Sequence, residues 1–179
     1  YESRLKVNKK NYSIPINLEM LENREFSKNQ KLLVLSEQGL GDTIQFSRYL
    51  IPLRNQGIDI VFCVQEKLKE LIKVSNLANK VYSKDYIPEL LNAKWIPLLS
   101  IPRILGVTPN NPILNKPYIK PPEKKIYEWG KYLRINKKPI VGINWQGNPE
   151  TEKSHLKGRS LNLDLFREIA LQDINLISL

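Results

Sequence analysis

The sequence predicts an α/β fold in which helices cover both faces of a doubly wound parallel sheet. Two continuous apolar runs of strand length, at residues 30–36 and 58–64, have the pattern of parallel strands that are covered on both faces. A helical pattern lies between them, and a glycine turn joins the first run to that helix. Residues 30–64 are therefore predicted to form one βαβ unit, with its first strand in the centre of the sheet and parallel to the next.

The elements that follow continue this alternation. The first helix is expected to run from near Thr43 to just before Gly57, because apolar residues recur there at helical spacing and glycine is favoured past a helix C-terminus. An amphipathic helix is predicted at residues 65–76, a short strand at 80–83 and a helical turn at 87–92. A strand end is predicted at 93–100, and after it a short helix at 101–109, stopped by Gly106 and Pro109. The residues before the first strand are polar and irregular, which is typical of a surface segment.

The second half begins with a proline-rich stretch, residues 110–124, which predicts an extended linker rather than a packed element. After it we expect a helix at residues 125–136 and a strand with a glycine turn at 138–149. A polar loop at 150–161, a helix at 162–172 and a terminal apolar run at 174–179 are expected to follow. The expected organisation is an N-terminal segment at residues 1–30 and a first α/β domain at 31–112. A linker with a crossing helix at 113–137 and an incomplete second α/β unit at 138–179 follow. Because the chain starts without methionine and stops inside an apolar run, we expect it to be part of a longer protein.

The composition is that of an ordinary globular protein, with 41% hydrophobic and 26% charged residues. No apolar run approaches the length of a membrane helix and no signal peptide opens the chain, so a cytoplasmic protein without a membrane span is expected. The net charge is +10, but the lysines are dispersed among carboxylates, so no nucleic-acid partner is expected. The single cysteine, Cys63, lies in an apolar run and is expected to be a small buried hydrophobic side chain rather than a reactive thiol.

The glycine turn after the first strand is the first candidate site. Gly39 and Gly41 open the helix as in a dinucleotide-binding fingerprint, but Ile44 stands where that motif needs its third glycine. What remains is a turn that another molecule can approach closely. The polar side chains around it are those of Glu37, Gln38, Asp42 and Gln45. The carboxylate of Asp42 is expected in the first turn of the helix, where it either caps the helix or faces a substrate.

The polar loop near the C-terminus is the second candidate site. Gly147 interrupts the strand before it, and Lys157, Arg159 and Ser160 come shortly before the next helix. A loop of this kind binds a diphosphate through positive charge and backbone N–H groups, and the alternative is a solvated basic loop. His155 is the only histidine and is expected at the surface, and no cluster of histidine, cysteine or paired aspartate predicts a metal site.

Three stretches, taken together and in order, resemble a known family: "LSEQGLGDTIQFSRYLIPLRNQG", "WIPLLSIPRILG", and "VGINWQGNP" followed by "GRSLNLDLF". They are similar to the domain found after tetratricopeptide repeats in many bacterial proteins, and to the heptosyltransferases of glycosyltransferase family 9. The resemblance covers nearly all of the chain from Lys31 onward, and "YESR" at the start resembles the last helix of such a repeat array. It implies the GT-B architecture, in which two Rossmann-like domains bind the acceptor and the nucleotide-sugar donor.

The resemblance also implies roles for the two candidate sites. Asp42 corresponds to the aspartate proposed as general base toward the acceptor hydroxyl, and Lys157 or Arg159 corresponds to the basic residue that binds the donor phosphates. The acceptor-side residues are then Glu37, Gln38, Gly39, Gly41 and Gln45. The donor-side residues are Asn144, Gln146, Gly147, Asn148, Lys157, Arg159 and Ser160. The carboxylate of Asp42 is expected to reach a cleft that it shares with the donor-side loop.

Two interpretations of the function remain open, and the retained carboxylate and cations favour the first. The first is a metal-independent glycosyltransferase that uses a nucleotide sugar as substrate, needs no cofactor and transfers the sugar to an acceptor hydroxyl. As a fragment, the chain itself is expected to be inactive. The second is a non-catalytic binding module whose upstream repeats recruit a protein partner. Uncovered edges of the strands at residues 140–143 and 176–179 also predict a dimer, strand exchange or disorder in that half.

Overall fold

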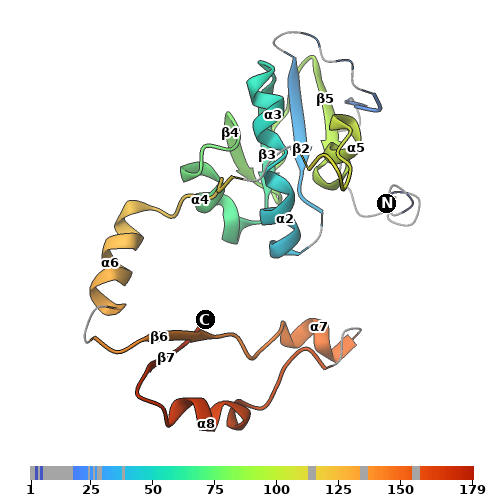
Figure 1. Cartoon of the computed structure of the whole chain (residues 1–179). Coiled ribbons are helices and arrows are strands. Elements are labelled where there is room, and N and C mark those ends of the chain that lie inside the picture. The colour runs from blue at the N-terminus through green and yellow to red at the C-terminus, as the bar shows by residue number, and fades with distance from the viewer. Residues whose placement is uncertain are drawn as a thin grey trace. The chain divides into compact units, whose positions relative to one another are not determined.

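The computed structural model describes residues 3, 5, 18–23, 25, 27, 30–37, 39–112, 116–133, 137–154 and 158–179, with the backbone alone at residues 150, 151 and 154 (Figure 1). Contacts within the chain divide it into two compact units, residues 1–122 and residues 123–179, and each unit is described by itself. None of the helices in the described part of the chain is long and apolar enough to cross a membrane.

The first unit contains a five-stranded sheet in which all neighbouring strands are parallel. In spatial order the strands are β1 (Glu19–Met20), β5 (Ala93–Pro97), β2 (Lys31–Leu35), β3 (Asp59–Val64) and β4 (Lys80–Ser83). The predicted α/β class, the central position of β2 and its parallel pairing with β3 are therefore confirmed. Every residue of β2 and β3 except the first of each is buried, which explains why both strands have continuous apolar sequences.

Helices alternate with these strands, as expected of a Rossmann-like sheet. In the described part of the unit they are α2 (Leu40–Ser47), α3 (Leu50–Asn55), α4 (Glu66–Val74), the 3-10 helix η1 (Leu98–Ser100) and α5 (Ile101–Leu105). Their apolar side chains pack on one face of the sheet, around the fully buried Phe62 of β3. Burying a side chain of this size stabilises the fold by about 1.5–3 kcal/mol relative to leaving it exposed.

The opposite face of the sheet carries Cys63 and is covered by an irregular connection between β4 and β5. Ile87 and Leu90 of this connection pack against the buried residues of that face. The helical turn expected at residues 87–92 is wrong, and Pro88, which has no N–H group to donate, lies within it. Among the described residues the helices therefore pack on one face only, and the expectation that helices also cover the second face is wrong for them.

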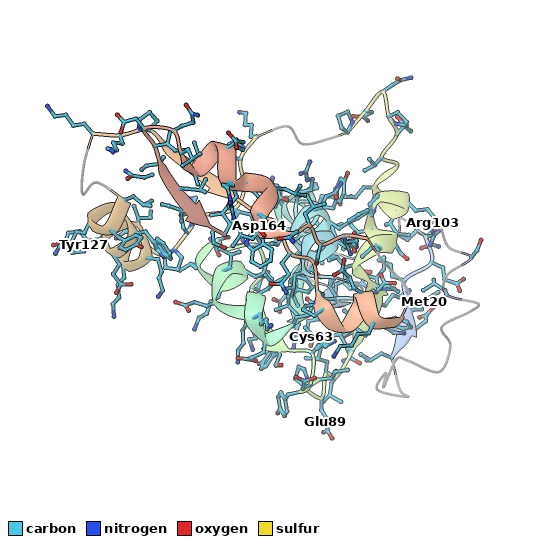
Figure 2. All side chains as sticks on the ribbon, turned by 90° about the horizontal axis from the view of Figure 1, so that it is seen from below. Met20, Cys63, Glu89, Arg103, Tyr127 and Asp164 are labelled. Atoms are coloured by element: carbon cyan, nitrogen blue, oxygen red, sulfur yellow. The ribbon has the colours of Figure 1, made fainter. Side chains whose placement is uncertain are left out.

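Cys63 itself has the environment that the sequence predicts. The side chain is fully buried (Figure 2), and burial raises the pKa of its thiol to about 11. A thiol with a raised pKa is protonated near neutral pH and is a poor nucleophile. The expectation of a small buried hydrophobic side chain is therefore confirmed.

The predicted helix between β2 and β3 is divided into α2 and α3, so the expectation of one continuous helix is wrong. Arg48 and Tyr49 form the turn between the two helices. Pro52 explains the break, because it has no N–H group for the carbonyl of Arg48 and its ring would collide with that carbonyl. Near the break, Ser47 Oγ donates a hydrogen bond to Ile44 O over 2.7 Å. Side chains thus satisfy carbonyl groups that the interrupted helix leaves open.

Two further expectations about the first unit have clear outcomes. The N-terminal segment does not lie only at the surface, because Leu21 is buried and its N–H donates to Trp95 O over 2.8 Å at the edge of the sheet. Gly57 and Gly106 follow α3 and α5 with φ values of 83° and 67°, as expected of glycines past helix C-termini.

Residues 117–122 of the proline-rich stretch form neither helix nor strand, and some of them pack against the first unit. Tyr118 and Ile119 are half-buried against the core, and Tyr118 Oη donates a hydrogen bond to Ile44 O over 2.7 Å. Lys120 N donates to Ser75 Oγ over 2.9 Å, and Ser75 Oγ lies 3.3 Å from Lys120 O. The expectation of an unpacked linker is therefore wrong for these residues, because their side chains and backbone find partners on α2 and α4.

The second unit contains α6 (Glu123–Leu133), β6 (Ile140–Ile143), α7 (Pro149–Ser154), the 3-10 helix η2 (Leu163–Phe166), α8 (Arg167–Ala170) and β7 (Asn175–Ser178). Strands β6 and β7 form a two-stranded parallel sheet, so the two strands predicted in this half pair with each other. Helix α7 lies in the predicted polar loop and was not expected. Among the hydrophobic side chains described in this unit, only Ile143 is buried, and Tyr127 on α6 is 64% exposed (Figure 2).

Candidate functional site

The carboxyl ends of β2, β3 and β5 lie at one edge of the first sheet, which we call the carboxyl edge. From β2 the chain proceeds through β3 to β4 and then returns to the other side of β2 as β5. The direction of winding therefore reverses between β2 and β5. Ligands of open α/β sheets bind beyond the carboxyl ends of the strands at such a reversal. The candidate residues Glu37, Gly39, Gly41, Asp42 and Gln45 follow β2 at this edge.

Glu37 connects the loops that follow β2 and β5. Its Oε2 accepts a hydrogen bond from the N–H of Leu99 over 2.9 Å, and Leu99 lies in η1 directly after β5. The carboxylate thereby binds one of the N–H groups that a helix start leaves without an intrahelical acceptor. Glu37 thus holds together the two loops on either side of the point of reversal.

Asp42 lies in the first turn of α2, as expected. The N-cap position is occupied by Gly39, which has no side chain to cap the helix, so Asp42 is not the N-cap residue. Its Oδ2 lies 3.6 Å from the position that a Cβ atom would take at Gly39, which places the carboxylate over the glycine turn. Among the described residues, Asp42 has no hydrogen-bond or ion-pair partner. The positive end of the helix dipole stabilises the half-buried carboxylate, which binds no other side chain among the described residues.

The two glycines leave open space above this turn. A Cβ atom at Gly41 would meet nothing within 4 Å, and one at Gly39 would meet only Asp42. Neither glycine has a positive φ, so the backbone conformation does not require them. Gln45 lies one helical turn after Asp42 and is exposed. The other predicted acceptor-side residue, Gln38, lies outside the described residues.

Three polar residues at the carboxyl edge were missed by sequence reasoning. Thr43 is fully buried in the first turn of α2, and its Oγ1 accepts a hydrogen bond over 3.0 Å from Nε2 of Gln65, which follows β3. Ser36 follows β2, and its Oγ is buried without a hydrogen-bond partner among the described residues. Each of Ser36 and Gln65 is the first polar residue after a buried strand, and this position is the signal that would have identified them.

The second candidate site lies within the second unit, after β6. The Gly147 N–H donates a hydrogen bond to Ser160 Oγ over 2.9 Å, and the Leu161 N–H donates to Trp145 O over 2.9 Å. A Cβ atom at Gly147 would lie 3.1 Å from Cβ of Arg159, so the two segments approach each other closely at the glycine. The structure therefore brings the two halves of the predicted donor-side loop together.

A carboxylate that the sequence did not single out lies at the centre of this loop. Glu152 Oε1 accepts hydrogen bonds from the N–H of Arg159 over 2.6 Å and from the N–H of Ser160 over 2.7 Å. Glu152 Oε2 accepts a third hydrogen bond from Ser160 Oγ over 2.5 Å. The Ser160 hydroxyl, the two N–H groups and the charge of Arg159 lower the pKa of Glu152. Nothing in the local pattern "PETEK" distinguishes Glu152 from the other glutamate, because the partners of Glu152 are contributed by a distant segment.

The remaining predicted donor-side residues lie at the surface where the structure describes them. Asn144, Gln146 and Asn148 are exposed, and Arg159 is exposed. Lys157 and His155 lie outside the described residues. Asp42 belongs to the first unit and these residues to the second, so the cleft that we expect them to share stays a prediction. The described residues contain no group of three or more histidine, cysteine, aspartate or glutamate side chains arranged to hold a metal ion.

Comparisons of the chain with protein-family models, with curated proteins and with solved structures find no match. The class that the structure defines is therefore a Rossmann-like parallel α/β protein with an additional two-stranded parallel sheet.

Proposed function

We propose that the chain belongs to a GT-B glycosyltransferase, similar to the heptosyltransferases, that transfers a sugar from a nucleotide-sugar donor to an acceptor hydroxyl. The observation that supports this most is the carboxylate of Asp42. It lies in the first turn of the helix after the central strand, over a glycine turn with open space, and it has no partner among the described residues. This is an arrangement in which a carboxylate is available to a bound hydroxyl group.

In the proposed reaction, Asp42 accepts the proton of the acceptor hydroxyl. The hydroxyl oxygen forms a bond to the anomeric carbon of the donor sugar, while the bond between that carbon and the diphosphate oxygen breaks. The diphosphate leaves with both electrons of that bond, and Lys157 and Arg159 are proposed to stabilise its charge. Ser36, Thr43 and Gln65 lie at the same edge as the base, and the hydrogen bond from Gln65 to Thr43 helps to keep the turn in place.

A specific observation favours the second interpretation, a non-catalytic binding module. The backbone N–H groups of Arg159 and Ser160, which would serve a donor diphosphate, are bonded to the chain's own Glu152. A loop that is permanently closed in this way would not bind a donor.

The experiment that tests the proposed function is a binding screen of the full-length protein against a panel of nucleotide sugars, followed by assays for release of nucleoside diphosphate when acceptors are added. We expect one donor to bind, and Arg159→Ala to weaken that binding. Asp42→Asn should leave donor binding unchanged and slow the release. Absence of binding to any nucleotide sugar would favour the non-catalytic module, and unchanged release by Asp42→Asn would remove Asp42 from the mechanism.

A further inference from the structure

The loop of the second unit contains an anion cradle, which we define as the backbone N–H groups of Arg159 and Ser160 together with the hydroxyl of Ser160. All three groups donate to a single carboxylate, that of Glu152, over 2.5–2.7 Å. The Ser160 oxygen also accepts a hydrogen bond from the N–H of Gly147, so the hydroxyl proton is directed toward the anion. Three short donors on one carboxylate are a complete anion-binding arrangement.

The backbone around the cradle is adapted to this task. Gly158 has a φ of 85°, in the left-handed region that favours glycine, and the two donating N–H groups follow it immediately. Successive N–H groups next to a left-handed residue form a concave nest that binds anions such as phosphate. Gly147 permits the close approach of the opposite segment, since a Cβ atom there would crowd Arg159. These features select for an anion in general, because carboxylate and phosphate oxygens accept the same hydrogen bonds.

Glu152 is also placed so that a second anion can compete with it. The side chain is half-buried rather than enclosed, and it extends from α7, a helix of six residues. A phosphate group has more acceptor oxygens and more negative charge than a carboxylate, so it gains more from the same donors and from Arg159.

We propose that the carboxylate of Glu152 is a built-in occupant of a diphosphate-binding cradle, which closes the cradle when no ligand is bound and leaves it when a diphosphate binds. The identity of the diphosphate as part of a nucleotide-sugar donor rests on the proposed function, whereas the exchange itself does not. Glu152 then acts as an internal competitor: it keeps the donor-side loop ordered in the absence of donor and lowers the affinity for free phosphates.

The test is a titration of the protein with inorganic pyrophosphate, followed through the amide resonances of Arg159 and Ser160. In the unmodified protein, saturating pyrophosphate should shift both resonances, because the acceptor of each N–H changes. In Glu152→Ala, pyrophosphate should bind about tenfold more tightly, because the three donors no longer have to leave the internal carboxylate before they bind the ligand. In Ser160→Ala, binding should be weaker than in the unmodified protein.

The matched control is Glu168→Gln, which removes the same charge from an exposed glutamate of α8, outside the cradle. It should change the affinity for pyrophosphate by less than about twofold. If Glu152→Ala and Glu168→Gln raised the affinity for pyrophosphate equally, the change in net charge would explain the effect, and the proposal would be overturned.

The titration of the unmodified protein keeps the test decisive if Glu152→Ala disturbs the loop. Pyrophosphate that fails to bind, or that binds without shifting the two amide resonances, contradicts the exchange. The result is also separable from the proposed function, because neither Asp42 nor sugar transfer enters the measurement. If sugar is transferred but Glu152→Ala does not change the affinity for pyrophosphate, the proposed function stands and the exchange is rejected. If Glu152→Ala raises that affinity but no sugar is transferred, the exchange stands and the proposed function is rejected.

Discussion

The two units hold their parallel strands by different means. In the first unit, β2 has a strand on each side, and a large apolar core covers it. In the described part of the second unit, β6 and β7 pair only with each other, and neither α6 nor α8 has a buried residue. The loop after β6 is instead held by the polar contacts of Gly147, Glu152 and Ser160. The comparison teaches that burial determines the structure of the first unit, whereas hydrogen bonds determine the loop of the second.

The largest expected effect concerns the core of the first unit. Phe62→Ala should lower the free energy of unfolding of this unit by about 3–5 kcal/mol, because it removes a fully buried aromatic side chain and leaves a cavity. Trp129→Ala, at a residue of α6 that is 51% exposed, should change the stability of the second unit far less. Amide hydrogen exchange, read separately for each unit, measures both. Equal losses would show that the units do not differ in this way.

The second prediction asks whether the rigid first unit carries the chemistry. Asp42→Asn should reduce turnover by roughly 10²–10⁴-fold if the carboxylate is the general base. It should lower stability by no more than about 1 kcal/mol, since only a charge at a helix N-terminus is lost. Sugar transfer and thermal unfolding are measured on the same variant. Asp59→Asn, at the start of β3 and therefore at the opposite edge of the sheet, is the control that should leave both quantities unaltered.

The third prediction tests whether the end of the linker belongs to the first unit. Tyr118→Phe removes the hydrogen bond to Ile44 O but keeps the ring, over which the Arg48 guanidinium lies at 5.0 Å. We expect a loss of about 0.5–1.5 kcal/mol in the stability of the first unit, measured by urea denaturation. Tyr127→Phe, an exposed position on α6, is the matched control. A loss of the same size in both variants would place the effect outside the contact between the linker and α2.

The smallest expected effect is a pH dependence confined to the second unit. The pKa of Glu152 is lowered in the folded protein, so its stabilising contribution is present above the ordinary pKa of a glutamate and disappears as the pH falls through the lowered value. The protection factors of the Arg159 and Ser160 amides should therefore decrease on acidification, while those of β2 and β3 stay constant. In Glu152→Gln this pH dependence should be absent. Parallel decreases in both units would point to general acid unfolding instead.

Sequence reasoning was most successful where a local pattern and the tertiary environment agree. The apolar runs of β2 and β3 are continuous because both faces of a central parallel strand are buried. A continuous apolar run of strand length therefore also predicts such a strand. Gly57 and Gly106 marked helix ends because the left-handed conformation is inexpensive only for glycine. Asp42 lies in the first turn of α2, as expected, although this helix begins at Leu40 and not near Thr43.

The features that were not predicted depend on partners far away in the sequence. Strand β1 has two residues and exists because the edge of β5 offers it hydrogen bonds. The α2–α3 break is the exception, because it has a local cause: a single proline, which cannot donate to the carbonyl four residues earlier. The connection after β4 is irregular although its apolar residues have a helical spacing, since those residues pack against the sheet without one.

The sequence by itself thus determined that strands and helices alternate, the parallel pairing at the centre of the first sheet, and the residues that follow its central strand. Only the tertiary structure decided that Glu37 accepts a hydrogen bond from Leu99, that Thr43 accepts one from Gln65, and that Glu152 occupies the anion cradle. The physical reason is that secondary structure depends on the periodicity of neighbouring residues, whereas each of these polar contacts joins groups that come together only after the chain has folded.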